Sequence, residues 1–168
     1  MNYWVRTLER MESALPKLLH KGGWKGIVRG GTHRAHRIFK VHEGFVVSID
    51  RYIPDSPKRR FPWLFGPVMG RVLEGSIAVG ISDAVRYDRR FPLPRRIREN
   101  GLFTIGKGQT FFIRPAYVAT RSVNKAALVL LVRRLPRSKR GREAVNFYAR
   151  LTRDRTRFIV SEAQRYYP

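Results

Sequence analysis

The histidines near the N-terminus are the residues of this sequence best suited to chemistry. His33 and His36 are three residues apart, with His20 before them and His42 after them. Imidazoles can bind a metal ion or transfer protons near neutral pH. Arginines stand next to His33 and His36, however, and fixed cations oppose the binding of a metal dication. The chain also has no cysteine. We therefore expect no metal site and no cofactor.

The same histidines permit a second chemistry, the metal-free cleavage of RNA. That reaction needs one group to deprotonate a 2′-hydroxyl and another to protonate the leaving oxygen, with cations around the phosphate. The candidates for these roles are His20, His33 and His36. No spacing in the chain demands this activity. An RNA endonuclease is therefore kept as an alternative, and the expected function is non-enzymatic.

Other catalytic signatures are weak. The nearest group of carboxylates is Glu74, Asp83 and Asp88, and neighbouring arginines can pair with all three. The chain contains no Walker-type phosphate loop, no dinucleotide-binding glycine motif after a strand, and no Gly-x-Ser-x-Gly elbow. The Gly106-Lys107-Gly108 segment more simply forms a tight turn. These patterns give no support to a nucleotide-hydrolysing or esterase-like enzyme.

Charge is the strongest signal in the sequence. The 168-residue chain has 35 Lys and Arg against 12 Asp and Glu, a formal net charge of +23. So small a chain repels itself strongly unless an anionic partner compensates the charge. Nucleic acid is the usual partner, because closely spaced phosphates release counterions when cations bind. Arginine predominates over lysine, and its guanidinium binds phosphate in a bidentate manner and stacks on bases. We expect nucleic acid as the partner, RNA rather than DNA.

Basic residues gather in the glycine-rich segment 20–42 and in arginine- and proline-rich loops near 54–67, 86–100 and 133–142. Aromatic residues interleave with the cations in two of these loops, a composition suited to single-stranded nucleic acid. No helix-turn-helix, KH or RNP1 motif is present, so sequence-specific base recognition is not expected. The expected contacts are Lys21, Lys25, Arg29, Arg34, Arg37, Lys58, Arg59, Arg60, Trp63, Arg89, Arg90, Arg95, Arg96, Arg98, Lys107, Arg133, Arg134, Arg137, Lys139, Arg140 and Arg142.

These observations favour a structural subunit of a larger ribonucleoprotein-type assembly, in contact with other protein subunits. A structural or assembly protein of a virus or phage particle is the alternative, in which the charge meets acidic neighbours or the packaged genome. No run of about 18 uncharged apolar residues exists, and we expect no membrane span. The expected location is the cytoplasm or a virion.

Two helices are expected to frame the elements that position these residues. Apolar residues recur at steps of three and four over 3–20, which predicts an amphipathic helix that Gly22-Gly23 ends. A similar pattern over 142–166 predicts a long C-terminal amphipathic helix, with arginines on its outer face.

Strands are expected between the helices. Residues 36–41 and 45–53 favour a hairpin around His42-Glu43-Gly44, and residues 102–115 a second hairpin around Gly106–Gly108. Residues 71–87 predict one or two further strands, whereas 123–135 suit a helix or a buried strand equally. The sequence therefore predicts a single basic α+β domain over 1–168, with a central antiparallel sheet of hairpins between two helices.

Overall fold

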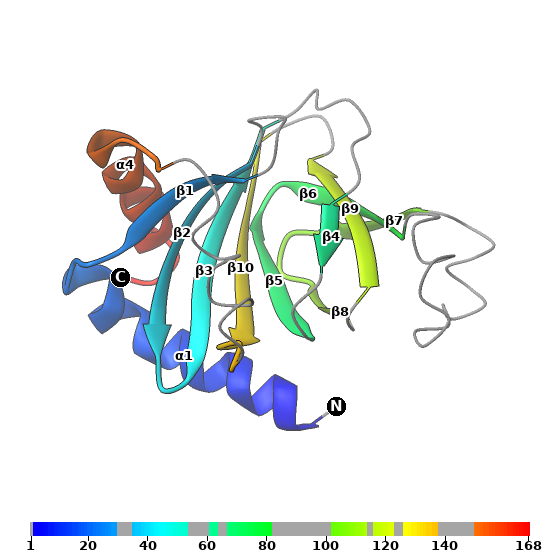
Figure 1. Ribbon diagram of the computed structural model, residues 1–168, viewed down its shortest axis with the longest axis horizontal. Helices are drawn as coiled ribbons and strands as arrows, with labels where there is room; N and C mark the ends of the chain where they lie inside the picture. Colours follow the sequence, from blue (N-terminus) through cyan, green and yellow to red (C-terminus); the bar gives the residue numbers. More distant parts are fainter. Residues whose placement is uncertain are drawn as a thin grey trace.

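The computed structural model describes residues 2–29, 35–53, 61–63, 67–81, 102–113, 116–122, 126–137 and 150–168. Within these ranges the chain forms two antiparallel sheets and two helices, α1 (Asn2–His20) and α4 (Arg153–Gln164) (Figure 1). The six-stranded sheet has the order β1 (Lys25–Arg29), β2 (Ala35–His42), β3 (Phe45–Tyr52), β10 (Ala127–Arg134), β5 (Val68–Glu74), β8 (Thr110–Ile113). The four-stranded sheet has the order β4 (Phe61–Trp63), β9 (Ala116–Ser122), β6 (Ser76–Ile81), β7 (Leu102–Gly106). The predicted α+β class with a central antiparallel sheet is confirmed.

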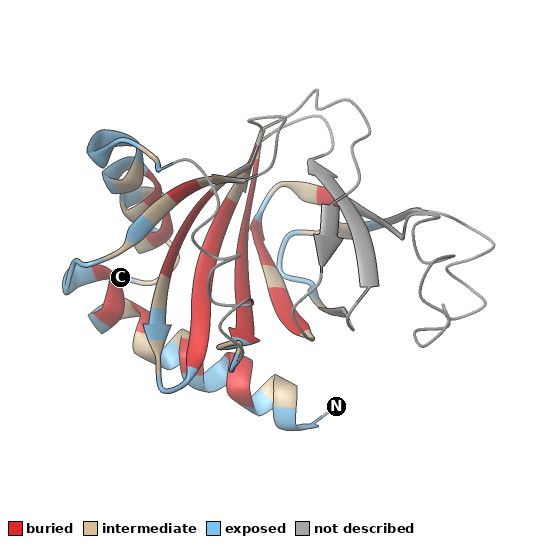
Figure 2. Ribbon diagram, viewed as in Figure 1, coloured by how far each residue is buried: buried red, intermediate tan, exposed pale blue. Residues whose placement is uncertain are grey.

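The six-stranded sheet is covered on both faces, by the helices on one side and by the four-stranded sheet on the other (Figure 1). Leu130 of β10 lies in one buried cluster with Leu8 and Met11 of α1. Its neighbour Val129 points the opposite way, into a cluster with Ile77 of β6. The central strands are therefore buried along most of their length (Figure 2).

This burial resolves the ambiguous segment 123–135 as the strand β10. A strand covered on both faces is apolar at every position, so its pattern lacks the alternation that marks a half-exposed strand. β10 pairs with β3 on one side and β5 on the other, in the middle of the sheet.

The predicted N-terminal helix is confirmed as α1, which buries Leu8, Met11 and Leu15 against the sheet. The chain leaves the helix through Gly22 (φ 66°) and Gly23 (φ 74°), in the left-handed region that glycine adopts without steric cost. The predicted end of this helix at the glycine doublet is therefore confirmed as well.

The first predicted hairpin is confirmed as β2 and β3. His42 pairs with Phe45, which leaves Glu43 and Gly44 as the two turn residues. Both have positive φ, 47° and 77°. This conformation is typical of the two-residue turns whose twist matches that of the flanking strands.

The second predicted hairpin is wrong in its pairing. The turn itself is present, since the Gln109 N–H donates to the Gly106 carbonyl at 3.1 Å. The strands on either side join different sheets: β7 pairs with β6, and β8 pairs with β5. The chain also changes sheet between β5 and β6, at Gly75 (φ 72°). Turn residues fix a change of direction, whereas the partner of each strand is set by contacts distant in the sequence.

The predicted long C-terminal helix is also wrong, because α4 begins only at Arg153 and has 12 residues. Thr152 caps it by accepting a hydrogen bond from the Arg155 N–H at 3.3 Å. Just before the cap, Arg150 forms an isolated bridge with Ile27 of β1. The chain around residue 150 is thus extended against the sheet edge, and residues 142–149 lie outside the described ranges. Among the described residues, neither helix is long and apolar enough to cross a membrane.

Candidate functional site

An open groove of about 1060 Å³ lies between the end of α1, β1 and α4, and we name it the β1–α4 groove. Four of its lining residues are cations, and no acidic residue lines it within the described part of the chain. The potential in the groove is therefore positive, which favours an anionic ligand. Its described lining comprises Leu19, Gly22, Gly23, Trp24, Lys25, Gly26, Ile27, Phe39, Arg150, Leu151, Arg153, Thr156, Arg157, Val160 and Gln164.

The wall formed by α4 is fixed to the edge strand β1 by close backbone contact. The Leu151 N–H donates to the Gly26 carbonyl at 2.9 Å. A Cβ at position 26 would overlap Thr156 Oγ1 and lie 2.9 Å from Leu151 Cβ. Only glycine allows this approach, and Gly26 is therefore a positioning residue for the α4 side of the groove.

The glycine doublet and a lysine shape the opposite rim. Gly22 and Gly23 turn the chain from α1 into β1, and both line the groove. Lys40 of β2 donates from Nζ to the Gly22 carbonyl at 2.6 Å. This bond holds the turn to the sheet and brings a further ammonium group to the rim.

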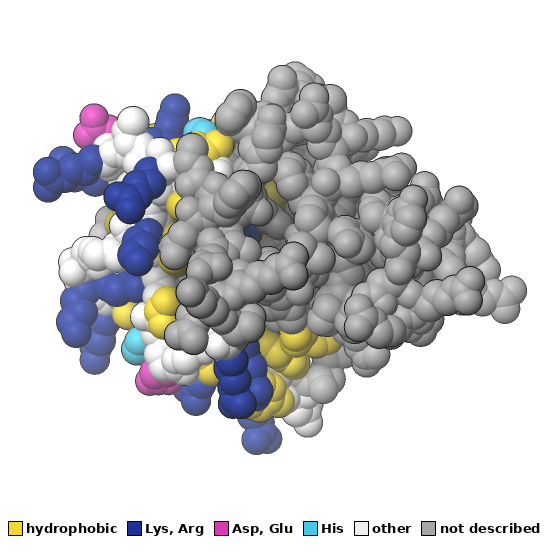
Figure 3. Space-filling model, viewed as in Figure 1, with side chains coloured by type: hydrophobic (Ala, Val, Ile, Leu, Met, Phe, Trp, Pro, Cys, Tyr) yellow, Lys and Arg dark blue, Asp and Glu magenta, His cyan; other side chains and the backbone are white. Residues whose placement is uncertain are grey.

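The cations of α4 are arranged against the stability of the helix itself. Arg153 and Arg155 stand in its first turn, where the helix macrodipole disfavours positive charge by about 0.3–1 kcal/mol each. Arg153 and Arg157, four residues apart, repel one another by about 0.2–0.5 kcal/mol. Among the described residues, Figure 3 shows several Lys and Arg side chains at the surface on the side where β1 and α4 lie. A bound anion would relieve both penalties.

A second cluster lies beside the groove on α4. Phe158 is 43% exposed, and the guanidinium carbons of Arg51 and Arg155 lie 5.4 and 5.7 Å from its ring centroid. Arg51 Nε also lies 3.1 Å from a carboxylate oxygen of Glu162. Burial lowers the pKa of the nearby His36, and the charges of Arg155 and Arg51 lower it further. His36 is therefore held in its neutral form at neutral pH.

The histidines proposed for RNA cleavage are not brought together within the described part of the chain. His20 is the exposed last residue of α1, and His36 lies in β2, with a buried Nδ1 that has no described hydrogen-bond partner. His33 lies outside the described residues. Among the described residues, no three His, Cys, Asp or Glu side chains are placed to hold a metal ion.

Two of the predicted phosphate contacts lie in the interior. Arg37 is only 2% exposed, and its Nε and Nη2 lie 2.5 and 2.6 Å from the two carboxylate oxygens of Asp50. The Tyr52 hydroxyl donates to the same carboxylate at 3.0 Å. Arg133 is buried in β10. Because buried guanidinium groups cannot reach a phosphate chain outside, Arg37 and Arg133 are removed from the contact set.

The other described predictions lie at scattered places in the fold. Lys21 and Lys107 are exposed, as are Arg134, which donates to the Tyr3 hydroxyl at 2.9 Å, and Arg137. Arg29 ends β1 and Trp63 ends β4. The predictions outside the described residues are Arg34, Lys58, Arg59, Arg60, Arg89, Arg90, Arg95, Arg96, Arg98, Lys139, Arg140 and Arg142.

Of the predicted contacts, Lys25 alone belongs to the described lining of the groove. The other three cations, Arg150, Arg153 and Arg157, were expected on the outer face of the C-terminal helix but not as a site. Their spacing of three and four residues was the signal in the sequence that could have placed them on one side of the chain. Nothing local indicated that β1 and its glycines would lie opposite them.

No protein-family model matches this chain, and no curated protein matches it. A protein of unknown function from Vibrio parahaemolyticus has 15% identity and a TM-score of 0.48 over 66% of this chain and 98% of its own. Hydroxypropylphosphonic acid epoxidase from S. wedmorenis has 14% identity and a TM-score of 0.48 over 66% of this chain. The match spans about half of the epoxidase chain, 55%. Similarities at this level carry no information on function.

Proposed function

We propose that this chain is a non-enzymatic nucleic-acid-binding subunit of a larger assembly, that RNA is its favoured partner, and that the β1–α4 groove is a principal contact surface. The observation that supports the proposal is the lining of the groove, in which four cations meet no described acidic residue. The net charge of +23 is in keeping with a polyanionic partner.

The spacing of two arginines on α4 suits a chain of phosphates. Arg153 and Arg157 project from successive turns of one helix, about 6 Å apart along its axis. That separation is close to the spacing of phosphates along a single strand, so both guanidinium groups can contact one nucleic-acid chain. Because the arginines are exposed, their contribution depends on salt and is obtained mainly by counterion release.

The test is the affinity for a single-stranded RNA, measured by fluorescence anisotropy over a range of salt concentrations. We expect log K to fall linearly with log salt in the natural chain. In the double variant Arg153→Gln/Arg157→Gln, the slope should become shallower by about 1.4, since each lost phosphate contact removes about 0.7. The affinity at 0.1 M salt should fall roughly 25-fold by the same relation.

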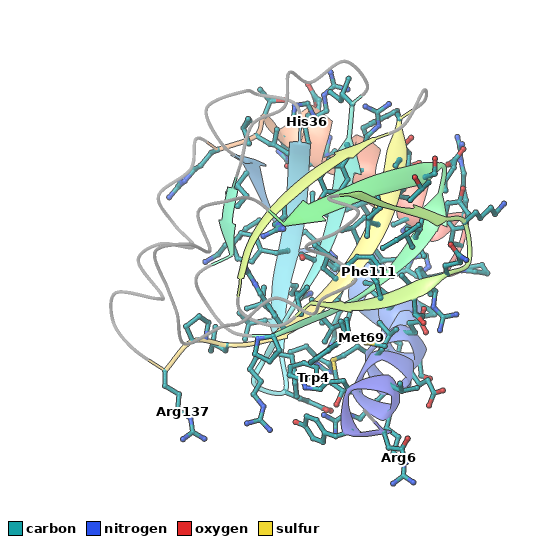
Figure 4. The ribbon with its side chains drawn as sticks, turned by 90° about the vertical axis from the view of Figure 1, so that its right-hand side faces the viewer. Trp4, Arg6, His36, Met69, Phe111 and Arg137 are labelled. Atoms are coloured by element: carbon teal, nitrogen blue, oxygen red, sulfur yellow. The ribbon has the colours of Figure 1, made fainter. Side chains whose placement is uncertain are left out.

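The matched control is Arg6→Gln/Arg10→Gln, which removes two exposed arginines with the same four-residue spacing from α1. Arg6 points away from the body of the molecule (Figure 4). This control lowers the net charge equally and should change the slope far less. Equal losses in the two double variants would show that binding follows net charge and not the groove. Absence of RNA binding, or binding indifferent to salt, would refute the proposal.

A further inference from the structure

The interior of the β1–α4 groove differs in chemistry from its rim. Trp24, Leu151 and Val160 line it as half-buried apolar side chains that also pack against the main core. The Trp24 ring is fixed, because its Nε1–H donates to the Leu18 carbonyl at 2.9 Å. The cations of Arg153 and Arg157 extend from exposed positions on α4. The groove thus combines an apolar floor with a cationic rim.

Such a floor is not needed to bind a chain of phosphates, which cations alone can hold. It is useful to a ligand that carries a flat, weakly polar group beside its negative charge. An unpaired nucleotide has both parts, since its base can lie on an aromatic side chain while its phosphate meets arginine. A duplex keeps its bases stacked inside and offers only phosphates and groove edges to such a site.

The size of the groove agrees with this ligand. Its volume of about 1060 Å³ is slightly above the usual range for small-molecule pockets, so a base and its sugar fit with room for the adjoining phosphates. The uncharged polar side chains of the described lining are only two, Thr156 and Gln164. The Thr156 hydroxyl already donates to the Thr152 carbonyl at 3.1 Å, and only its oxygen can accept a bond from a ligand. Gln164 is then the one uncharged side-chain donor in the described lining, which favours stacking over the recognition of one base.

We propose that the β1–α4 groove binds an unpaired nucleotide of single-stranded RNA, with the base on the floor formed by Trp24, Leu151 and Val160. The phosphates on either side then contact Arg153 and Arg157. This inference rests on the proposed function, to which it adds selectivity for single strands over duplexes and for nucleotides over bare polyanions.

The first test compares three probes at equal phosphate concentration: a single-stranded RNA, an RNA duplex of the same length, and inorganic polyphosphate. The single strand should bind at least about fivefold more tightly than the duplex, because one stacked base contributes about 1–3 kcal/mol. Equal binding of single strand and duplex, both weakened by Arg153→Gln/Arg157→Gln, would overturn this inference and leave the proposed function standing. Binding of none of the probes would overturn both.

The second test detects binding at the floor of the groove through the fluorescence emission of Trp24. The chain has three tryptophans, so the variant Trp4→Phe/Trp63→Phe leaves Trp24 as the only one. Single-stranded RNA should quench its emission, and polyphosphate should not. The matched control Trp24→Phe/Trp63→Phe keeps Trp4, which packs against Phe45 and Phe112 and should not respond. Quenching by polyphosphate, or of Trp4 instead of Trp24, would overturn the inference.

A variant that keeps all three tryptophans guards against misfolding of these tryptophan variants. Val160→Ala shortens one side chain of the floor and leaves every cation of the groove in place. It should weaken the binding of single-stranded RNA several-fold while the binding of polyphosphate stays within experimental error. Equal loss for both probes would show that the floor does not contact a base.

Discussion

Arginines serve two different purposes in the centre and at the edge of the six-stranded sheet. In the centre, Arg37 is 2% exposed and is neutralised by Asp50, which is fully buried. At the edge, Arg153 and Arg157 are exposed on α4 beside a groove without a described acidic lining residue. A buried charge must be paired to be tolerated, whereas an exposed one stays available to a ligand. The net charge is therefore not uniformly available for binding, and the fold decides which cations a partner can reach.

The largest change in stability is expected at the buried pair of Arg37 and Asp50, in the centre of the sheet. Asp50→Ala leaves the Arg37 guanidinium buried without its carboxylate, and this should reduce the free energy of unfolding by about 3–5 kcal/mol. Urea denaturation followed by circular dichroism measures the change. The double variant Arg37→Met/Asp50→Leu removes both charges and should recover much of the loss. If it is as unstable as Asp50→Ala, the unpaired charge is not the cause.

The partner of Arg37 could have been found from the sequence alone. A two-residue turn at Glu43-Gly44 makes His42 the partner of Phe45, and counting outward along the strands then places Arg37 opposite Asp50. The register of the predicted hairpin thus identifies Arg37 as an arginine that a carboxylate neutralises. Local turn chemistry was sufficient for this pair, because both residues belong to one hairpin.

The next largest change in stability is expected at Gly26, where the sheet contacts α4. Gly26→Ala places a Cβ against Thr156 and Leu151, which should cost about 1–3 kcal/mol of stability and displace α4 from β1. The affinity for single-stranded RNA should fall as well, because α4 carries Arg153 and Arg157. Gly108→Ala is the matched control: the backbone there (φ 80°) strains an alanine, but among the described residues no atom beyond the chain neighbours lies within 4 Å of the added Cβ. That variant should lose stability and keep its affinity, and a similar loss of affinity in both would disconnect Gly26 from the groove.

The contact between α4 and the edge strand β1 could not be predicted in the same way, for a physical reason. The backbone of residues 150–151 is held by β1, more than 120 positions earlier in the chain, and no local pattern encodes that contact. The arginine periodicity over 142–166 suggested one continuous helix, although Thr152, a good capping residue, marked its true start. The sheet change at Gly106–Gln109 was missed for the same reason, since a turn does not reveal the partners of its strands.

A moderate effect is expected at the C-terminal tyrosines, which tie the end of α4 to other elements. The Tyr167 hydroxyl donates to Glu12 of α1 at 2.8 Å, and the Tyr166 hydroxyl to Glu74 of β5 at 2.7 Å. Tyr167→Phe should lower the free energy of unfolding by about 1 kcal/mol, because Glu12 loses a hydrogen bond in a partly buried place.

The same tyrosines predict a dependence on alkaline pH. Burial, and after it the hydrogen bond to Glu74, together raise the pKa of Tyr166 from 10.0 to about 12. Because the pKa is higher in the folded state, the contribution to stability is complete below pH 10 and is lost as the pH rises through 12. Thermal unfolding between pH 9 and 12 should show a shallower decline in Tyr166→Phe than in the natural chain. If the stability of Tyr166→Phe falls as steeply with pH as that of the natural chain, ionisation of Tyr166 is not the cause of the fall.

The smallest change in stability should occur at the edge, with the opposite sign to the change in the centre. Arg153→Gln/Arg157→Gln removes a cation from the first turn of α4 and relieves a repulsive pair, so the ligand-free chain should become more stable by about 0.5–1 kcal/mol. Its affinity for single-stranded RNA should fall at the same time. In 1 M salt the gain in stability should vanish, because exposed charges are screened over about 3 Å. The loss from Asp50→Ala should persist there, because its charge is buried. A fall in stability on removing Arg153 and Arg157 would show instead that these arginines serve the fold, like Arg37, and the distinction between centre and edge would fail.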